Sequence, residues 1–272
     1  MLRTVDLSKL CTIRVGGICN NYGRIDSLND TIKIMQSIPD SKTINWLGLG
    51  SNVLFSDANI DSAIIHTKKC FNNIVTNTDG SINVGAGVTC PSLAKYCMKN
   101  NMCDADFLAG IPGTIGGAII MNAGAFGSEI SSFIKSVRLV DRCGNIRTIP
   151  VDKLNFGYRT SNFPDQNFII DALLCFPKKL SSDSKINDLL LHRKLTQPIG
   201  KPSFGSVFKN PVGNYAAKLI ESVGLKGKMI GSALFSEKHC NFIINTGNAS
   251  YFDVMSLIDE AKNKVFIEHN IE

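Results

Sequence analysis

The chain has 272 residues, of which 44% are hydrophobic and 19% charged, and its formal net charge is +6. This balance is typical of a globular protein with a sizeable core, in one large domain or two to three small ones. No apolar run reaches the roughly 18 residues of a membrane span, and residues 1–17 lack the apolar core of a signal peptide. We therefore expect a cytoplasmic protein without a membrane partner.

Cysteine and histidine spacing argues against a disulfide framework and against a metal site. The nine cysteines are odd in number and form no C-x-x-C, and the four histidines form no H-x-x-x-H pair. Free thiols in a reducing compartment are the simpler interpretation. The basic residues come in pairs, without long runs or interleaved aromatic residues. This pattern favours small anionic ligands over nucleic acid.

The first half of the chain predicts alternating strands and helices. A short strand over 22–26 precedes a helix that Ser27 and Asp30 begin with an S-x-x-D pattern. Strands are expected at 43–50, 52–57 and 62–67. A hairpin follows over 73–87 with Asp79-Gly80 as its turn, and Pro91 opens a helix that runs to about Asn100.

The second half predicts a hairpin, a polar loop and three helices. Strands at 136–141 and 146–149 flank Cys143-Gly144, and the loop 155–167 leads to a strand over 168–177. The polar stretch 178–185 is typical of a domain boundary. Helices are expected from about Asp183 to Leu195, from Tyr215 to Val223, and from near Phe252 to the end of an apolar stripe at Val265.

Glycine clusters in three segments, 47–57, 84–88 and 109–124. Segment 109–124 carries no charge and is too interrupted by glycine for an ordinary helix or strand. None of the three matches a Rossmann fingerprint or a P-loop. Each alone reads as a tight turn, but three together favour a large phosphate-bearing ligand held by backbone N–H groups.

Five motifs in these segments and beyond them resemble a known family. They are LGLGSNVLFSD (47–57), IPGTIGGAIIMNAGAFGSEI (111–130), FGYRTSNF (156–163), FGSVFKNP (204–211) and HCNFIIN (239–245). In combination they resemble the UDP-N-acetylenolpyruvoylglucosamine reductases, the MurB family of flavin enzymes, in the shorter class that lacks an extra tyrosine-bearing loop. The resemblance runs from about Thr12 to near the C-terminus.

The resemblance implies an α+β fold with a two-part FAD-binding unit of the vanillyl-alcohol-oxidase (PCMH) type and a C-terminal α+β substrate domain. The expected divisions are 1–66, 67–180 and 181–272. The implied enzyme is an NADPH-dependent FAD oxidoreductase that reduces UDP-N-acetylglucosamine-enolpyruvate to UDP-N-acetylmuramate in peptidoglycan synthesis, and so serves cell-wall biogenesis, cell shape and cell division. A monomer is expected.

The implied chemistry needs a cation and a proton donor. Hydride addition to the vinyl carbon places charge on the substrate carboxylate, and the adjacent carbon then takes a proton. Arg159 matches the family's catalytic arginine and Ser206 its proton donor; without the resemblance, these two would read as a solvated arginine and a turn serine. The implied substrate-binding residues are Tyr158, Lys201, Lys209 and Asn210.

The residues that the resemblance implies for FAD lie in all three glycine segments. They are Gly48, Gly50, Ser51, Asn52, Gly85, Ala86, Pro112, Gly113, Thr114, Gly116, Gly117, Asn122 and Gly124.

Two alternative functions remain open at this point. The family pattern includes a glutamate after the last helix, and Glu272 falls a few positions before it. A catalytically impaired homologue that binds FAD and a UDP-sugar is therefore one alternative. Another FAD oxidoreductase on the same scaffold is the second, although it does not predict the FGSVFKNP match.

Overall fold

The computed structural model describes the chain except for residues 1, 68–69, 165 and 179–183. Two compact units are present. Unit 1 comprises residues 1–3, 20–49 and 61–191, and unit 2 comprises residues 4–19, 50–60 and 192–272. Unit 2 thus joins two segments from the first quarter of the chain to its C-terminal third. The expected boundary at 180/181 lies outside the described residues.

A small sheet in the N-terminal part has the strand order β1-β2-β4-β3. Its strands are β1 (Arg3–Asp6), β2 (Ile18–Arg24), β3 (Ile44–Leu47) and β4 (Ala63–His66), and β4 pairs in parallel with both β2 and β3. Helix α1 (Leu28–Ser37) connects β2 to β3. The predicted cap is confirmed, because the Ser27 hydroxyl accepts a hydrogen bond from the Asp30 N–H.

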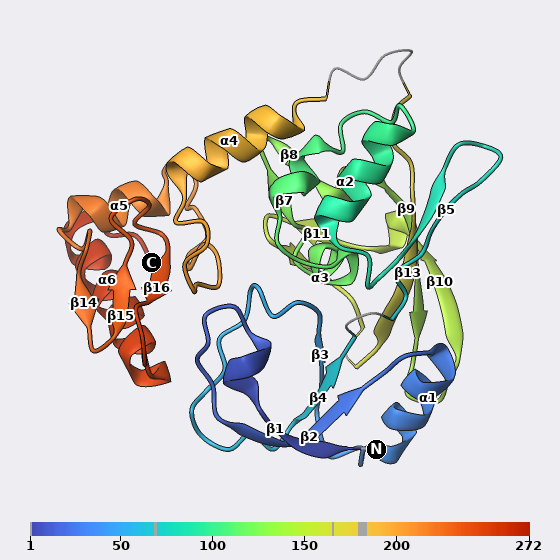
Figure 1. Ribbon diagram of the computed structural model, residues 1–272, viewed down its shortest axis with the longest axis horizontal. Coiled ribbons are helices and arrows are strands. Elements are labelled where there is room, and N and C mark those ends of the chain that lie inside the picture. The colour runs from blue at the N-terminus through green and yellow to red at the C-terminus, as the bar shows by residue number, and fades with distance from the viewer. Residues whose placement is uncertain (1, 68–69, 165, 179–183) are drawn as a thin grey trace. The chain divides into compact units, whose positions relative to one another are not determined.

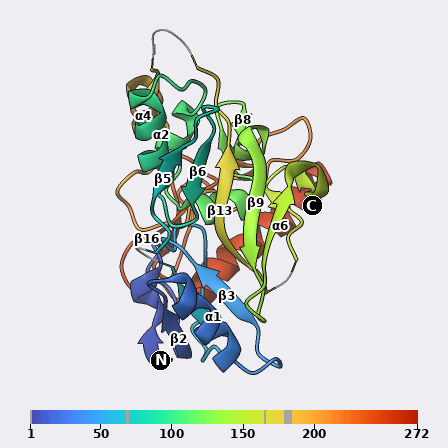
Figure 2. The ribbon, with the colours of Figure 1, turned by 90° about the vertical axis from the view of Figure 1, so that its right-hand side faces the viewer.

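The main sheet of unit 1 is antiparallel, with the order β10-β9-β13-β6-β5. Figure 2 shows β5, β6, β13 and β9 side by side. The strands are β5 (Ile74–Thr76), β6 (Ile82–Gly85), β9 (Ile134–Val140), β10 (Ile146–Pro150) and β13 (Phe168–Leu174). Both predicted hairpins are confirmed; Gly80 and Gly144 occupy their turns with φ of 84° and 88°.

Helices α2 (Cys90–Lys99) and α3 (Ile115–Ile120) bury their apolar residues in the core of unit 1. The prediction that segment 109–124 forms no ordinary helix was wrong. Thr114 caps α3, and Ile115, Ala118 and Ile119 supply enough buried apolar surface to offset the low helix propensity of Gly116 and Gly117.

Two short hairpins and three 3₁₀ turns complete the described part of unit 1 together with the start of the next helix, and a fourth turn lies in unit 2. The hairpins are β7 (Gly124–Ala125) with β8 (Ser128–Glu129), and β11 (Phe156–Gly157) with β12 (Thr160–Ser161). The polar loop expected over 155–167 therefore contains the second of these hairpins. The turns are η1 (Leu7–Leu10, in unit 2), η2 (Asp106–Gly110), η3 (Ile130–Phe133) and η4 (Val151–Lys153), and the helix is α4 (Ile186–Thr196).

Unit 2 is built around α6 (Tyr251–His269), α5 (Ala216–Ser222) and the antiparallel sheet β14-β15-β16 (Figure 1). The strands are β14 (Met229–Ile230), β15 (Ala233–Phe235) and β16 (Ile243–Asn245). Ser250 and Asp253 form a reciprocal capping box at the start of α6. Val254, Leu257 and Ala261 bury the predicted stripe of this helix.

The expected strand at 52–57 was wrong. The segment belongs to no strand, and Val53, Leu54 and Phe55 pack against the apolar cluster of unit 2. An apolar run of this length suits a strand or a core-covering loop equally well, and only the tertiary partner decides between them. Here the partner is the cluster that contains Ile13 and Phe235.

Candidate active site

Three glycines of unit 1 let its loops pack closely on one another. A Cβ at Gly48 would lie 2.7 Å from Oγ1 of Thr114, and a Cβ at Gly116 would lie 3.0 Å from Cβ of Ala86. A Cβ at Gly85 would collide with the carbonyl oxygen of Phe71. The close neighbours of these glycines are therefore other parts of the same chain, and the loops at 48, 85–86 and 114–116 form one packed group.

The start of α3 is anchored to the loop that follows β6. The N–H groups of Ile115 and Gly116 donate to the carbonyl oxygens of Val88 and Ala86, each at 2.8 Å, and Thr114 Oγ1 accepts from the Gly117 N–H. Gly117 itself is exposed, and the nearest atom to a Cβ there is 3.7 Å away. Of these four glycines, Gly117 is the one at which an added Cβ would meet its neighbours at no more than ordinary van der Waals contact.

The predicted residues 50–52 lie in unit 2, beside the loop that carries Ser206. Gly50 has φ of 64°, and its carbonyl oxygen accepts the Thr12 N–H at 2.9 Å. A Cβ at Gly205 would lie 3.9 Å from Oδ1 of Asn52. In the described part of the chain, the N–H groups of buried Gly50 and of Asn52 have no acceptor. Donors of this kind fit the pyrophosphate of FAD, which accepts backbone N–H groups.

Arg159 stands in the two-residue turn between β11 and β12 with φ of 55°. Its Nη1 lies 3.2 Å from the carbonyl oxygen of Asn122 and 3.0 Å from Oε1 of Glu129, and its Nη2 lies 2.6 Å from the carbonyl oxygen of Gly124. The side chain is 28% exposed. The sequence without the resemblance read this arginine as solvated, and the structure instead gives it three protein acceptors.

Asn122 joins the same group of residues from the end of α3. It is 1% exposed and has φ of 40°. Its Nδ2 donates to Oε2 of Glu129 at 2.8 Å and to the carbonyl oxygen of Gly157 at 2.9 Å, and its Oδ1 accepts the Ser131 N–H. A Cβ at Gly124 would lie 2.8 Å from Cγ of Glu129. Asn122 and Gly124 thus support the hairpins around Arg159.

Tyr158 lies beside the guanidinium of Arg159. Its ring centroid is 4.8 Å from Cζ of Arg159, within the range of a cation–π contact, and the residue is 46% exposed. The ring therefore shields the arginine and still presents surface outward.

Ser206 is exposed on a loop of unit 2 whose backbone pairs with the segment that contains Asn241 and Phe242. Ser206 forms an isolated bridge with Phe242, and the Val207 N–H donates to the carbonyl oxygen of Asn241 at 2.9 Å. Asn241 also bonds both backbone groups of Phe208 through its side chain. The structure thus holds the backbone at Ser206 while its side chain faces outward.

The other predicted substrate residues of unit 2 differ in what their side chains contact. Lys201 and Lys209 are exposed. Asn210 uses Oδ1 to accept the Ala216 N–H at 3.0 Å, so its side chain caps the start of α5. A substrate contact from these three residues stays a prediction.

Pro112 and Gly113 precede α3, and the carbonyl oxygen of Gly113 accepts the Cys90 N–H at 3.0 Å. This bond ties the segment to the start of α2. Pro112 is exposed. Their predicted contact with FAD is untested.

Sequence reasoning missed three residues that organise these loops: Glu129, Asn241 and Asn245. Asn245 is 4% exposed and donates to the carbonyl oxygen of Ile13 at 2.9 Å, which links β16 to the N-terminal segment. All three stand inside motifs that carry the resemblance, FGSEI and HCNFIIN. A polar residue in an otherwise apolar motif was the available signal.

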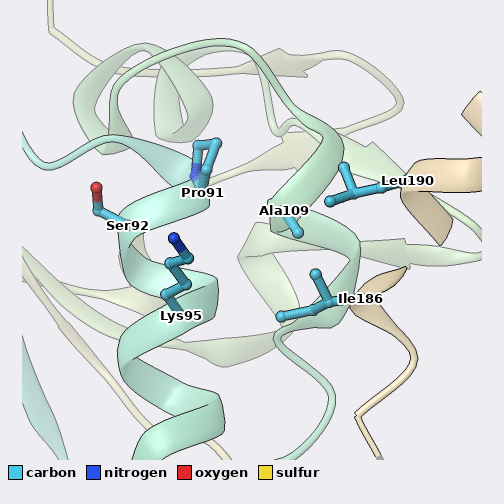
Figure 3. A pocket seen from close by; sticks show the side chains of 6 residues that line it. All are labelled: Pro91, Ser92, Lys95, Ala109, Ile186 and Leu190. Atoms are coloured by element: carbon cyan, nitrogen blue, oxygen red, sulfur yellow. The ribbon is translucent and has the colours of Figure 1, made fainter. Parts of the chain in front are cut away.

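A pocket of about 270 Å³ lies elsewhere on unit 1 (Figure 3). Its lining side chains come from α2, η2 and α4, and they include Lys95, Ala109 and Leu190. None of the predicted site residues lines it. Among the described residues, no helix is long and apolar enough to span a membrane, and no group of three or more metal-ligating side chains is present.

Comparison with known proteins covers almost the whole chain. Residues 23–150 match the FAD binding domain family, and residues 197–272 match the C-terminal domain of UDP-N-acetylenolpyruvoylglucosamine reductase. The reductase of Coxiella burnetii (strain Dugway 5J108-111) is 40% identical over 98% of this chain and 91% of its own length. That of Legionella pneumophila (strain Paris) is also 40% identical, over 98% of this chain and 89% of its own length.

The fold is likewise shared with a solved member. The crystal structure of the MurB reductase from Thermus caldophilus has a TM-score of 0.85 and 28% identity, and the match covers 100% of this chain and 97% of that one. The predicted α+β fold with an FAD-binding unit is confirmed. The chain belongs to the UDP-N-acetylenolpyruvoylglucosamine reductase family.

Proposed function

We propose that the protein reduces UDP-N-acetylglucosamine-enolpyruvate to UDP-N-acetylmuramate with NADPH, using FAD, in the synthesis of peptidoglycan precursors. The observation that carries this function is the match to named reductases over 98% of the chain. The match of residues 197–272 to the reductase C-terminal domain favours this reaction over another oxidoreductase on the same scaffold.

The reaction balances with one hydride and one proton. NADPH loses a hydride and becomes NADP⁺, and the C=C bond of the enolpyruvyl ether gains the hydride at its terminal carbon and a proton at the adjacent carbon. FAD, when bound, would supply the hydride-transfer chemistry between NADPH and the substrate. The protein's own side chains must then bind the substrate carboxylate and deliver the proton.

Arg159 is the group that we assign to the substrate carboxylate. Negative charge grows on that carboxylate as the hydride arrives, and a fixed cation stabilises the charge most where water is excluded. The three protein acceptors that hold Arg159 support this role, because they reduce the motion of the guanidinium before substrate arrives. Tyr158 shields one side of the same group.

Ser206 is the group that we assign to proton delivery. A free serine is a weak acid, so this role requires cations or hydrogen-bond donors near the hydroxyl. Lys201 and Lys209 are the basic residues in the same stretch of chain. The fastened backbone of residues 206–208 supports the assignment, because a proton donor must be positioned to be effective.

FAD fits the residues that we assign to it in each unit. The exposed face of Gly117 and the N–H groups of Gly50 and Asn52 are suited to ring and phosphate contacts. We also propose that the chain has three divisions at 1–66, 67–180 and 181–272, and that the protein is a monomer with a cytoplasmic location.

Purification and a two-substrate assay test the function. The protein is expected to be yellow, with a flavin spectrum, and to oxidise NADPH when UDP-N-acetylglucosamine-enolpyruvate is added. A colourless protein without such oxidation contradicts the proposal. A yellow protein that oxidises NADPH only with oxygen as acceptor favours another flavin oxidoreductase instead.

A further inference from the structure

Glu129 is one of the residues that hold Arg159. The proposed reaction has so far given it no role. Glu129 ends the hairpin β7–β8, while Arg159 stands in the turn of β11–β12. Oε1 of Glu129 accepts from Arg159 Nη1 at 3.0 Å, and Oε2 accepts from Asn122 Nδ2 at 2.8 Å. Each carboxylate oxygen therefore has its own donor.

The hydrogen bonds that Arg159 makes with the described part of the protein leave two of its N–H donors unused. A guanidinium has five N–H donors. Three protein acceptors occupy two donors on Nη1 and one on Nη2. Within the described residues, Nε–H and the second Nη2–H have no acceptor. Two donors on adjacent nitrogens are the number that a carboxylate accepts in a bidentate pair.

Among the three acceptors that hold Arg159, Glu129 is the charged one. Side chains of Arg159 and Glu129 are 28% and 34% exposed, so the pair is partly shielded from solvent. The other two acceptors are neutral carbonyl oxygens of Asn122 and Gly124. Loss of the carboxylate would leave the guanidinium held by two neutral carbonyl oxygens and by the ring of Tyr158.

Backbone conformation supports the same conclusion. Asn122, Phe126 and Arg159 all have positive φ, at 40°, 55° and 55°, although none is glycine. Such residues persist where the surrounding contacts determine the conformation, and they are found often at functional sites. Two of the three are direct members of the Asn122–Glu129–Arg159 network.

We propose that Glu129 is a positioning residue for Arg159. Its carboxylate holds Nη1 through one oxygen and is itself held by Asn122 through the other, so that the two remaining donors of Arg159 stay available for the carboxylate of the substrate. This inference rests on the proposed function. Glu129 does not touch the reacting atoms and transfers no proton.

Binding of two UDP-sugars to the FAD-loaded protein tests this role without turnover. UDP-N-acetylmuramate carries the carboxylate, and UDP-N-acetylglucosamine does not. Glu129→Gln is expected to weaken binding of the first about tenfold, the size found within one hydrogen-bond network, and to leave binding of the second unchanged. The matched control is Asp171→Asn, which breaks the Arg138–Asp171 pair of the same unit and should change neither affinity.

A second variant shows whether Glu129 acts through Arg159. In an Arg159→Ala background, Glu129→Gln is expected to cause no further loss of UDP-N-acetylmuramate affinity. Equal weakening of both UDP-sugars by Glu129→Gln, or no weakening of either, overturns the positioning role. If the unaltered protein binds neither UDP-sugar, the proposed function fails; if it binds both and Glu129→Gln matches it, only this inference fails.

Discussion

Asn241 and Phe208 exchange two hydrogen bonds: Oδ1 of Asn241 accepts the Phe208 N–H at 2.8 Å, and Nδ2 donates to the Phe208 carbonyl oxygen at 2.9 Å. Asn241 is 3% exposed. A single side chain thereby imitates a strand partner for the loop that carries Ser206. The buried amide thus satisfies both backbone groups of half-buried Phe208, which would otherwise lose their protein partner.

Replacing Asn241 should therefore destabilise the loop and the fold together. Asn241→Ala leaves both backbone groups of Phe208 without their partner, and we expect a loss of about 2–4 kcal/mol in the free energy of unfolding. Urea titration measures this loss. Asn248→Ala, at an exposed asparagine of the same unit, is the control and should change the free energy by less than about 0.5 kcal/mol. Equal effects of the two variants would contradict the role of Asn241 as the partner of the Phe208 backbone.

Ser206→Ala should separate the two halves of the reaction. Bleaching of the flavin by NADPH is expected to be unchanged, whereas return of the flavin absorbance on addition of the enolpyruvyl substrate should slow by about 10²–10⁴, the contribution of a positioned acid. Stopped-flow absorbance measures both. Ser203→Ala in the same loop is the control. Equal slowing of both halves would argue against proton donation by Ser206.

Adjacent glycines in α3 should respond in opposite ways. Gly116→Ala places a methyl 3.0 Å from Cβ of Ala86 and should destabilise the protein by about 1–3 kcal/mol. Gly117→Ala meets nothing nearer than 3.7 Å, so the FAD-free protein should gain up to about 1 kcal/mol through helix propensity.

The affinity for FAD then tests whether Gly117 leaves room for the cofactor. If the flavin nucleotide lies against this exposed helix face, the added methyl of Gly117→Ala must displace it, and FAD affinity should fall about tenfold or more. Titration of FAD into the FAD-free variant measures the affinity. An unchanged affinity would remove Gly117 from the set of cofactor contacts.

Buried thiols should make the stability fall at alkaline pH. Burial raises the pKa of Cys90 and of Cys97 to about 12, above the ordinary value of 9.0. The folded protein therefore keeps these protons where the unfolded chain has lost them. The stabilisation is complete below the ordinary pKa and is lost as pH rises from about 9 toward about 12.

Urea unfolding at about pH 8 and about pH 10 measures this loss, and Cys90→Ala should make the decrease smaller. Alkylation gives an independent check. The exposed thiols Cys143 and Cys175 should react with iodoacetamide well before Cys90 and Cys97 in the folded protein, as mass spectrometry can show. Labelling of all four at one rate would contradict the burial.

Prediction from the sequence succeeded where a few neighbouring residues carry the information. Ser27 and Asp30, three positions apart, form the cap at the start of α1, and the turns at Gly80 and Gly144 form where small flexible residues separate β-prone runs. These signals are local because capping and turn geometry involve atoms of at most four or five consecutive residues. The same reasoning failed at 52–57, where the partner of the segment is remote in sequence.

The sequence by itself determined the family, the α+β class, most helices and hairpins, and the identity of Arg159 and Ser206 as candidates. Only the tertiary structure decided what surrounds them: Glu129 meets Arg159 across 30 positions, and Asn241 meets Phe208 across 33. Such pairs depend on which loops the packing of the core brings together, and no local propensity encodes that. The glycines show the same division, because their spacing is visible in the chain, whereas the neighbours that require them appear only once the loops have packed.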